Sequence, residues 1–290
     1  MKGIILSGGL GTRLYPSTIA ISKQLLPIYN KPMIYYSLSS LMLAKIKDVL
    51  LITTKKDVSS YKRLFGDGSH LGMSIKYKVQ KKPKGLADAF ILGSKFIGKE
   101  DVCLILGDNI FYGDGFPDLL INAKEIVKSK KNAVIFTYPV KKPSDYGIAN
   151  ILNNKLISLI EKPKKSKSKN AVVGLYFYPN SVIEKAKKVK PSKRGELEIT
   201  DLNKIYLKLK KIDVIQIGRG YAWFDAGSVD NLHEVSQLIK SIENRMGHKI
   251  GCIEEIALKN KWVTRKYLKK TTKKYCNSEH GLYVDTLTIK

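Results

Sequence analysis

Residues 3–16 have the sequence GIILSGGLGTRLYP, in which a short apolar run leads directly into a glycine-rich turn. The run Gly3–Ser7 predicts a buried β-strand. The glycines after it let the backbone come close to a ligand, and their successive N–H groups can surround phosphate oxygens. The turn lacks the Gly-Lys-[Ser/Thr] of a Walker A loop, and Leu14 stands where a dinucleotide fingerprint needs its third glycine. The Arg13 guanidinium beside such a turn predicts a site for a triphosphate.

The chain that follows this turn alternates helical patterns with short apolar runs. Helical patterns cover residues 33–46 and 85–97, and strand patterns cover residues 48–54, 75–80 and 102–108. This alternation indicates an α/β fold in which helices cover both faces of a largely parallel sheet. We therefore expect a Rossmann-like three-layer sandwich whose mixed central sheet is mostly parallel.

The second half of the chain continues with both kinds of element. We expect helices at residues 116–129, 181–189, 198–210 and 229–246, strands at residues 133–140, 171–178, 212–217 and 221–224, and a hairpin at residues 146–160 that turns at Asn153-Asn154. From about residue 250 onwards the helical patterns are short. Because the sequence has no internal repeat and no clear linker, we predict one large domain at residues 1–249 and a helical C-terminal extension at residues 250–290.

The formal net charge of +27 raises the question of a polyanionic partner. Lysine supplies 46 of the 52 positive residues, since only six are arginine, and the lysines are scattered over the whole chain. The sequence has no basic stripe interleaved with aromatic residues and no RNA-binding motif. We therefore expect no nucleic-acid partner, although a positive field would help to attract phosphorylated substrates.

The start of the chain and its cysteines indicate a cellular compartment. Residues 1–7 lack the apolar stretch and the cleavage site of a signal peptide, and the longest apolar runs are too short to span a membrane. The three cysteines, Cys103, Cys252 and Cys276, are odd in number and widely spaced, which favours neither a disulfide nor a zinc site. We expect a cytoplasmic protein without a membrane partner.

Further motifs follow the glycine turn in a characteristic order. They include GGLGTRLYPST at residues 8–18, SKQLLPIYNKPMIYY at residues 22–36, LGDNIFYG at residues 106–113, RGELEITD at residues 194–201 and GRGYAWFDAG at residues 218–227. Together these motifs resemble the sugar nucleotidyltransferase family, most closely its members that use dTTP. The resemblance covers nearly the whole chain, with small departures at Ser7, Ser37 and Phe224-Asp225-Ala226 and a diverged tail after about Lys261.

Two aspartates, Asp108 and Asp225, each follow an apolar strand. Ligands of open α/β sheets bind at the carboxyl ends of strands, and Mg²⁺ usually takes one or two carboxylates together with substrate phosphates. Either residue could instead be an ordinary turn aspartate. The resemblance implies that both bind one Mg²⁺, and the parallel-sheet prediction can bring the two strand ends to one edge.

The resemblance also implies a reaction. A phosphate oxygen of α-D-glucose 1-phosphate would attack the α-phosphorus of dTTP, giving dTDP-glucose and pyrophosphate, the first step toward dTDP-L-rhamnose and other deoxysugars of cell-surface polysaccharide. The attacking oxygen is already anionic, so positioning and charge stabilisation would suffice without a general base. The resemblance further implies a homotetramer, with inhibition by an end product at a separate interface site.

Site residues come from the same resemblance, supported by the chemistry of each side chain. The predicted catalytic residues are Arg13, Lys23, Asp108 and Asp225. The predicted nucleotide-binding residues are Gly8, Gly9, Gly11, Thr12, Arg13, Gln24, Gln80 and Gly85, of which Gln80 and Gly85 would contact the thymine. The predicted residues for the sugar phosphate are Asn109, Gly147, Glu161, Lys162, Val172, Tyr176 and Arg194. Glu196 and Glu198 are expected to support the site or to begin the next helix.

Alternatives remain open at this point. The nucleotide could be UTP, CTP or ATP, and the sugar could differ. The charge by itself would also suit a basic nucleic-acid-binding protein. An inactive regulatory homologue is disfavoured, because every charged residue expected at the site is present.

Overall fold

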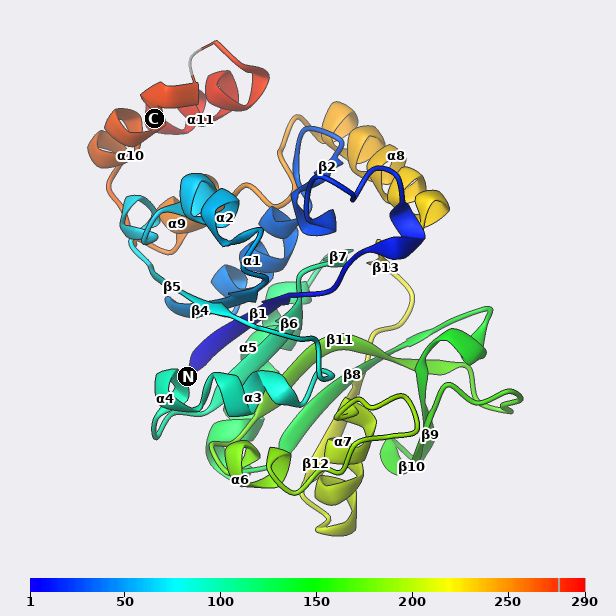
Figure 1. Cartoon of the computed structure of the whole chain (residues 1–290). Coiled ribbons are helices and arrows are strands. Elements are labelled where there is room, and N and C mark those ends of the chain that lie inside the picture. Colours follow the sequence, from blue (N-terminus) through cyan, green and yellow to red (C-terminus); the bar gives the residue numbers. More distant parts are fainter. Residues whose placement is uncertain (276, 290) are drawn as a thin grey trace.

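The computed structural model describes residues 1–275 and 277–289, and its centre is a nine-stranded sheet (Figure 1). The strands are β1 (Lys2–Ser7), β4 (Asp48–Thr53), β5 (Ser74–Val79), β6 (Val102–Leu106), β8 (Ala133–Pro139), β9 (Gly147–Leu152), β10 (Lys155–Glu161), β11 (Asn170–Tyr178) and β12 (Ile212–Gln216). β5, β4, β1 and β6 are parallel neighbours, and among the described strands of this sheet β10 and β11 run against the rest. The prediction of a mixed, mostly parallel sheet is confirmed.

Helices cover both faces of the sheet, as the alternating buried side chains of its strands require. Ile5 and Leu51 pack on one face, beneath α1 (Ile34–Leu43), α2 (Val58–Phe65) and α5 (Phe116–Lys130). Ile4 and Leu50 pack on the other face, against α3 (Asp88–Leu92), α4 (Ser94–Ile97), α6 (Val182–Ala186) and α7 (Ile199–Lys208). Because successive side chains of a strand point to opposite faces, strands that are apolar throughout must be covered on both. The three-layer prediction is therefore confirmed.

A second, two-stranded sheet lies beside the first and was not predicted. β7 (Asn109–Gly113) pairs antiparallel with β13 (Tyr221–Asp225). A short antiparallel pair of β2 (Pro27–Ile28) and β3 (Lys31–Pro32) lies near α8 (Val229–Met246), which also packs on β13. The sequence indicated the β13 strand, but the expectation that its end meets the end of β6 within the parallel sheet is wrong, because β13 belongs to this second sheet.

Two local predictions differ in outcome. The hairpin turn is confirmed, because Asn153 and Asn154 both have positive φ, at 48° and 58°. The helix expected over residues 85–97 is instead two short helices, α3 and α4, that meet at Gly93. A Cβ at Gly93 would lie 2.9 Å from the Ile4 side chain, so this glycine permits close packing on β1 at the point where the helix breaks.

The C-terminal segment consists of α9 (Ile253–Lys259), α10 (Arg265–Thr271), a 3₁₀ turn (Thr272–Tyr275) and α11 (Glu279–Ile289). Its apolar residues, such as Ile253 and Leu268, belong to the same hydrophobic cluster as residues of α1 and α2. The sequence predicted this segment as an extension of the large domain, and its apolar side chains pack into the core of that domain. Among the described residues, no helix is long and apolar enough to cross a membrane.

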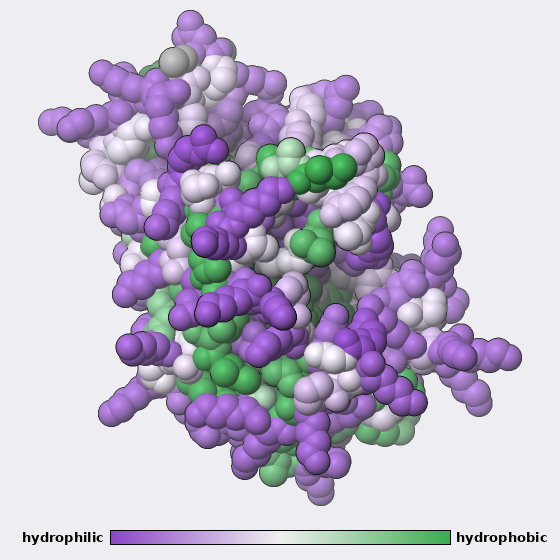
Figure 2. Space-filling view, viewed as in Figure 1, coloured by the Kyte–Doolittle hydropathy of each residue, from purple (hydrophilic) through white to green (hydrophobic). Residues whose placement is uncertain are grey.

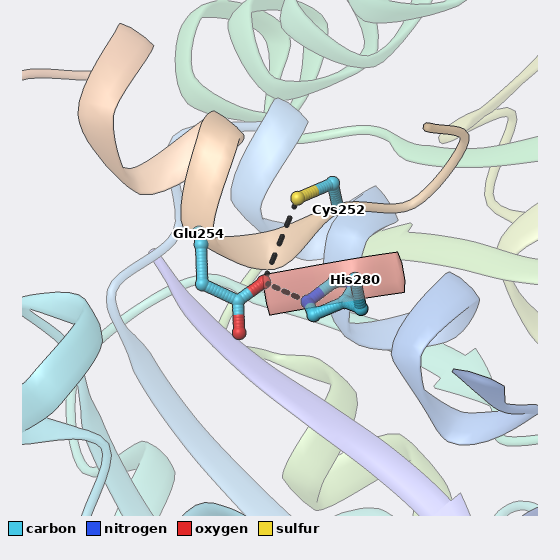
Figure 3. Close-up of side chains that lie close together, drawn as sticks. All are labelled: Cys252, Glu254 and His280. Carbon is cyan, nitrogen blue, oxygen red and sulfur yellow. Dashed lines mark hydrogen bonds and ion pairs between the residues drawn. The ribbon is translucent and has the colours of Figure 1, made fainter. Parts of the chain in front are cut away.

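A buried polar cluster connects α11 to α9 (Figure 3). Glu254 accepts hydrogen bonds from the Tyr275 hydroxyl at 2.7 Å, from His280 Nε2 at 3.2 Å and from Cys252 Sγ at 3.6 Å. Burial opposes ionisation of Glu254, but His280 and Tyr275 outweigh it and lower the pKa of the carboxyl. Because both carboxylate oxygens accept hydrogen bonds, we interpret the cluster as an anchor for α11.

Cys103 and Cys252 are buried free thiols, and Cys276 lies outside the described residues.

Candidate active site

A cavity of about 330 Å³ opens beside the carboxyl end of β6. Its walls come from the glycine turn, the strand ends of both sheets, the β9–β10 hairpin and the segment before α7. The lining residues are Arg13, Leu86, Leu106, Asp108, Asn109, Asp145, Tyr146, Gly147, Glu161, Lys162, Val172, Gly174, Tyr176, Arg194, Glu196, Glu198, Ile199, Thr200, Trp223 and Asp225. Figure 2 shows that this face of the molecule is hydrophilic around its rim, with hydrophobic side chains gathered toward its centre. The structure thus brings together the predicted metal ligands and every predicted sugar-phosphate residue.

The glycine turn has the backbone conformation that only glycine adopts easily. Gly9 has φ of 108° and Gly11 has φ of 63°, and the Gly11 carbonyl accepts a hydrogen bond from Thr18 Oγ1 at 2.8 Å. The turn leads into a 3₁₀ helix (Thr12–Leu14) that carries Arg13. A Cβ at Gly227 would lie 2.7 Å from Arg13 Nη2 and 2.9 Å from Asp225 Oδ1. Gly227 therefore leaves space for the Arg13 guanidinium and the Asp225 carboxylate to approach the same point.

Asp108 and Asp225 are neighbours because β7 and β13 pair. Asp108 lies just before β7, Asp225 ends β13, and the register aligns Asp225 with Asn109. The backbone N–H of Ala226 also donates to the Asp108 carbonyl at 3.0 Å. We expected the two carboxylates to meet as neighbouring strand ends of the parallel sheet. That route is wrong, since an antiparallel pair outside the main sheet brings them together.

Opposite charges surround the two carboxylates. Lys23 donates to and forms an ion pair with Asp108. Burial would raise the pKa of Asp108, but the Lys23 ammonium and the hydrogen bonds from Lys23 and Asn109 lower it. Burial and the Asp108 charge instead raise the pKa of Asp225 to about 6, against the opposing effects of Lys23, Arg13 and Lys162. Two acids with opposite shifts in one cavity are typical of a functional site.

The donor set fits a divalent cation. Two carboxylates face a cavity that is rich in cationic side chains, and hard oxygen donors of this kind are those that Mg²⁺ prefers. Burial and the charge of Asp108 raise the pKa of Asp225, so its negative charge is disfavoured in this cavity despite the nearby cations. A bound cation would supply the missing positive charge, with Asp108 and Asp225 as its ligands.

The sugar side of the cavity centres on Glu161, at the end of β10. One carboxylate oxygen accepts a hydrogen bond from Thr200 Oγ1 at 2.5 Å and the other from Arg194 Nη2 at 3.3 Å. Arg194 also donates to both oxygens of Glu198, at 2.9 Å. A Cβ at Gly147 would lie 2.9 Å from Thr200 Oγ1, so this glycine keeps the pocket floor open. The arrangement presents a carboxylate and a guanidinium side by side, which suits sugar hydroxyls and a phosphate.

Asn109 has a role that the sequence did not indicate. Its amide N–H donates to Asp108 Oδ1 at 3.2 Å, and its amide oxygen accepts from the Gly174 N–H at 2.9 Å and from Trp223 Nε1 at 2.7 Å. The side chain is thus fixed by β11 and β13, and it holds the Asp108 carboxylate in place. Contact between Asn109 and the sugar phosphate stays a prediction.

Of the two residues predicted to contact the thymine, Gln80 lines a separate recess, whereas Gly85 lines neither this recess nor the main cavity. This recess has a volume of about 530 Å³ and is lined by Gly9, Leu10, Thr54, Lys55, Lys56, Val79, Gln80, Lys81 and Pro83. A Cβ at Gly8 would lie 2.7 Å from Gln80 Oε1, so Gly8 belongs beside this recess. Gln24 is 1% exposed and accepts a hydrogen bond from Ser22, so its contact with the nucleotide also stays a prediction.

Several cavity residues carried no signal in the sequence. Thr200 and Trp223 lie in the motifs at residues 194–201 and 218–227 without an assigned role, Tyr146 begins the predicted hairpin, and the structure places all three in the lining. Trp223 packs edge-on against Tyr146, with 5.3 Å between ring centroids. The identity of a threonine or an aromatic residue does not by itself indicate whether its side chain faces the core, a cavity or solvent. Only the fold shows that these side chains face a cavity.

Comparisons with known proteins agree with this geometry. Residues 2–242 match the protein family described as Nucleotidyl transferase. The chain is 50% identical over 291 residues to the glucose-1-phosphate thymidylyltransferase of Neisseria meningitidis serogroup A, with full coverage of both proteins. It is 46% identical over 285 residues to the protein of that name from Mycobacterium tuberculosis, covering 98% of each.

Two solved structures extend the comparison. A putative glucose-1-phosphate thymidylyltransferase from Bacillus anthracis, in complex with sucrose, is similar with a TM-score of 0.75 and 41% identity, covering 82% of this chain and 94% of that one. A UDP-glucose pyrophosphorylase complexed with UDP-glucose has a TM-score of 0.72 and 25% identity, covering 83% of this chain and 98% of that one. The similarity to both confirms the fold.

Proposed function

This chain belongs to the nucleotidyl transferase family, and from that premise we propose that it is a glucose-1-phosphate thymidylyltransferase. It joins dTTP and α-D-glucose 1-phosphate to give dTDP-glucose and pyrophosphate. The observation that carries the proposal is the cavity that Arg13, Asp108 and Asp225 line beside the Glu161–Arg194 pair, with Lys23 paired to Asp108. In this proposal the triphosphate site and the sugar-phosphate site are adjacent.

The site supports a single in-line displacement. A phosphate oxygen of glucose 1-phosphate attacks the α-phosphorus of dTTP, the bond to the bridging oxygen breaks, and pyrophosphate leaves. Arg13 and Lys23 stabilise the charge that moves onto the transferring and leaving phosphates. Glu161 orients the sugar hydroxyls, and Arg194 and Lys162 hold the attacking phosphate. Mg²⁺ bound by Asp108 and Asp225 would neutralise phosphate charge.

The thymine contacts Gln80 and Gly85 in this proposal, and the glycine turn surrounds the triphosphate. The product is used for dTDP-L-rhamnose and other deoxysugars of cell-surface polysaccharide. We further infer that the enzyme acts in the cytoplasm as a homotetramer inhibited by an end product. These last inferences rest on the family alone.

The purified enzyme should release pyrophosphate from dTTP and glucose 1-phosphate only with Mg²⁺, and a chelator should stop the reaction. We expect UTP to be used less well than dTTP. We expect ATP and GTP to be used poorly, because the Gln80 recess accepts a pyrimidine edge. A coupled pyrophosphate assay with each nucleotide measures this directly. Equal rates with all four nucleotides would contradict the role given to Gln80.

Arg194→Ala and Lys162→Ala should each raise the KM for glucose 1-phosphate about tenfold, with a smaller fall in kcat. Each removes a charge-assisted hydrogen bond to a phosphate that is already present in the ground state. Initial rates at varied glucose 1-phosphate give both constants, and Lys193→Ala, an exposed neighbour of Arg194, is the matched control. A fall in kcat at unchanged KM would mean that the two phosphate sites are exchanged.

A further inference from the structure

The Gln80 side chain has only one chemically sensible orientation in this structure. Gln80 follows β5, its backbone N–H donates to the Thr53 carbonyl at 2.8 Å, and its side chain amide lies 3.1 Å from Asp88 Oδ2. An aspartate carboxylate at neutral pH only accepts hydrogen bonds, so the amide atom that faces it must be the NH₂ group. The amide oxygen consequently points away from Asp88, toward Gly8.

The position of Asp88 is itself rigidly held. Asp88 begins α3 and is 8% exposed. The turn before it is fixed by Leu197, whose N–H donates to the Lys84 carbonyl at 2.7 Å and whose carbonyl accepts from the Ala87 N–H at 3.1 Å. A Cβ at Gly85 would lie 2.5 Å from the Leu197 backbone, so the two segments are in direct contact. Asp88 is therefore a fixed acceptor to which the Gln80 amide must adapt.

We propose that Asp88 is a positioning residue that sets the base selectivity of this enzyme by holding the Gln80 oxygen toward the nucleotide base. The inference rests on the function proposed above and names Asp88 as a residue on which the base selectivity of that function depends. An oxygen at this place accepts a hydrogen bond from N3–H of thymine or uracil. The N3 atom of cytosine is an acceptor, and two acceptors that face each other repel. Asp88 thus favours dTTP and UTP over dCTP without touching the base.

A purely structural role for Asp88 makes a different prediction. An acidic residue in the first turn of a helix stabilises the helix wherever it occurs, and that effect does not depend on the base of the substrate. Replacing Asp88 would then change stability and overall activity together. A change in the ratio between two nucleotides separates the positioning role from this one.

The test is the Asp88→Asn variant. Asparagine keeps the shape of the side chain but can offer either an oxygen or an NH₂ group, so Gln80 can present either atom to the base. We expect the preference for dTTP over dCTP, as the ratio of kcat/KM values, to fall about tenfold or more, through the KM of the nucleotides. The KM for glucose 1-phosphate should stay within about twofold.

Asp57→Asn is the matched control. Asp57 is also a buried aspartate, and its carboxylate accepts a hydrogen bond at 2.6 Å from Thr54, which lines the same recess. Its replacement should leave the ratio of dTTP to dCTP unchanged. Asp88→Ser provides a second variant if Asp88→Asn folds poorly, because a hydroxyl also both donates and accepts. Calorimetric binding of dTTP and dCTP gives the same ratio without turnover.

The outcomes distinguish a failure of the role proposed for Asp88 from a failure of the proposed enzyme function. Wild-type turnover with dTTP, combined with an unchanged dTTP-to-dCTP ratio in both Asp88 variants, overturns the role of Asp88 and leaves the enzyme activity standing. Absence of turnover with dTTP in the wild-type protein overturns the proposed function itself. A ratio that falls in the Asp88 variants and not in Asp57→Asn supports the inference.

Discussion

An Arg13→Ala variant is expected to lose about 10³-fold in kcat, which corresponds to about 4 kcal/mol of transition-state stabilisation. Arg13 lies where the cavity meets the glycine turn, with its guanidinium beside Asp225. Charge on the α-phosphate and on the leaving pyrophosphate grows during the displacement, so a fixed cation there acts mainly on the transition state. The KM for glucose 1-phosphate should change by less than about threefold.

The measurement is steady-state pyrophosphate release with both substrates varied. Arg63→Ala is the control, because Arg63 is an exposed arginine on α2 whose guanidinium donates to Ser60. Lys23→Ala should also lower kcat, although it additionally leaves Asp108 without its ion-pair partner. If Arg13→Ala raised the KM for glucose 1-phosphate and left kcat intact, Arg13 would belong to the sugar-phosphate site.

The second large effect concerns Asp225, for which activity and stability should change in opposite directions. Asp225→Asn removes one predicted ligand of Mg²⁺, and we expect kcat to fall about 10²- to 10³-fold. The same change removes a buried charge that faces Asp108, so the metal-free protein should gain about 1 to 3 kcal/mol at neutral pH. Melting curves recorded with chelator should show the gain as a rise of a few degrees.

The pH dependence of this gain has a definite sign. The pKa of Asp225 is raised from 3.8 to about 6, so its ionisation costs free energy in the folded state. That cost is fully present above the raised pKa and disappears as the pH falls from about 6 toward 3.8, because the folded carboxyl then takes up a proton. The stability difference between Asp225→Asn and wild type should shrink over the same interval. A stability difference that stays constant across this whole pH interval would contradict the raised pKa of Asp225.

Asp108→Asn provides the contrast. It should also lower kcat, but it removes the carboxylate that pairs with Lys23 in a largely buried position, so stability should fall by about 2 kcal/mol. The two substitutions would thus both reduce activity but would shift the melting temperature in opposite directions. Equal effects of the two substitutions on stability would contradict the different charge environments described above for the two carboxylates.

Much of the fold could be predicted because its signals are local. The apolar runs of β1, β4 and β6 are short and uninterrupted, as strands covered on both faces must be, and α8 was predicted with its observed ends. The turn at Asn153-Asn154 follows from the tolerance of asparagine for positive φ. These features depend on a few neighbouring residues.

The predictions that failed depended on pairing between distant segments. β7 was not predicted, since only Gly107 and Asp108 separate it from β6 and its five residues were interpreted only as part of a motif. The place of β13 was wrong, because an isolated strand of five residues does not indicate which partner it will take. The split of residues 85–97 at Gly93 depends on the close approach of Ile4, which is distant in the sequence.

The sequence by itself determined the α/β alternation, the glycine turn and the charged groups available for chemistry, because strand and helix periodicity and turn conformation arise from near neighbours. Only the tertiary structure decided how those groups meet. The register of β7 and β13 places Asp225 beside Asp108 across 117 residues of chain (225 − 108), and burial of the pair then raises the pKa of Asp225. The contact of Gln80 with Asp88 likewise requires α3 to be held by Leu197. The distances between these side chains and their burial away from water are set by the folded chain, and both are needed for the groups to act together as a site.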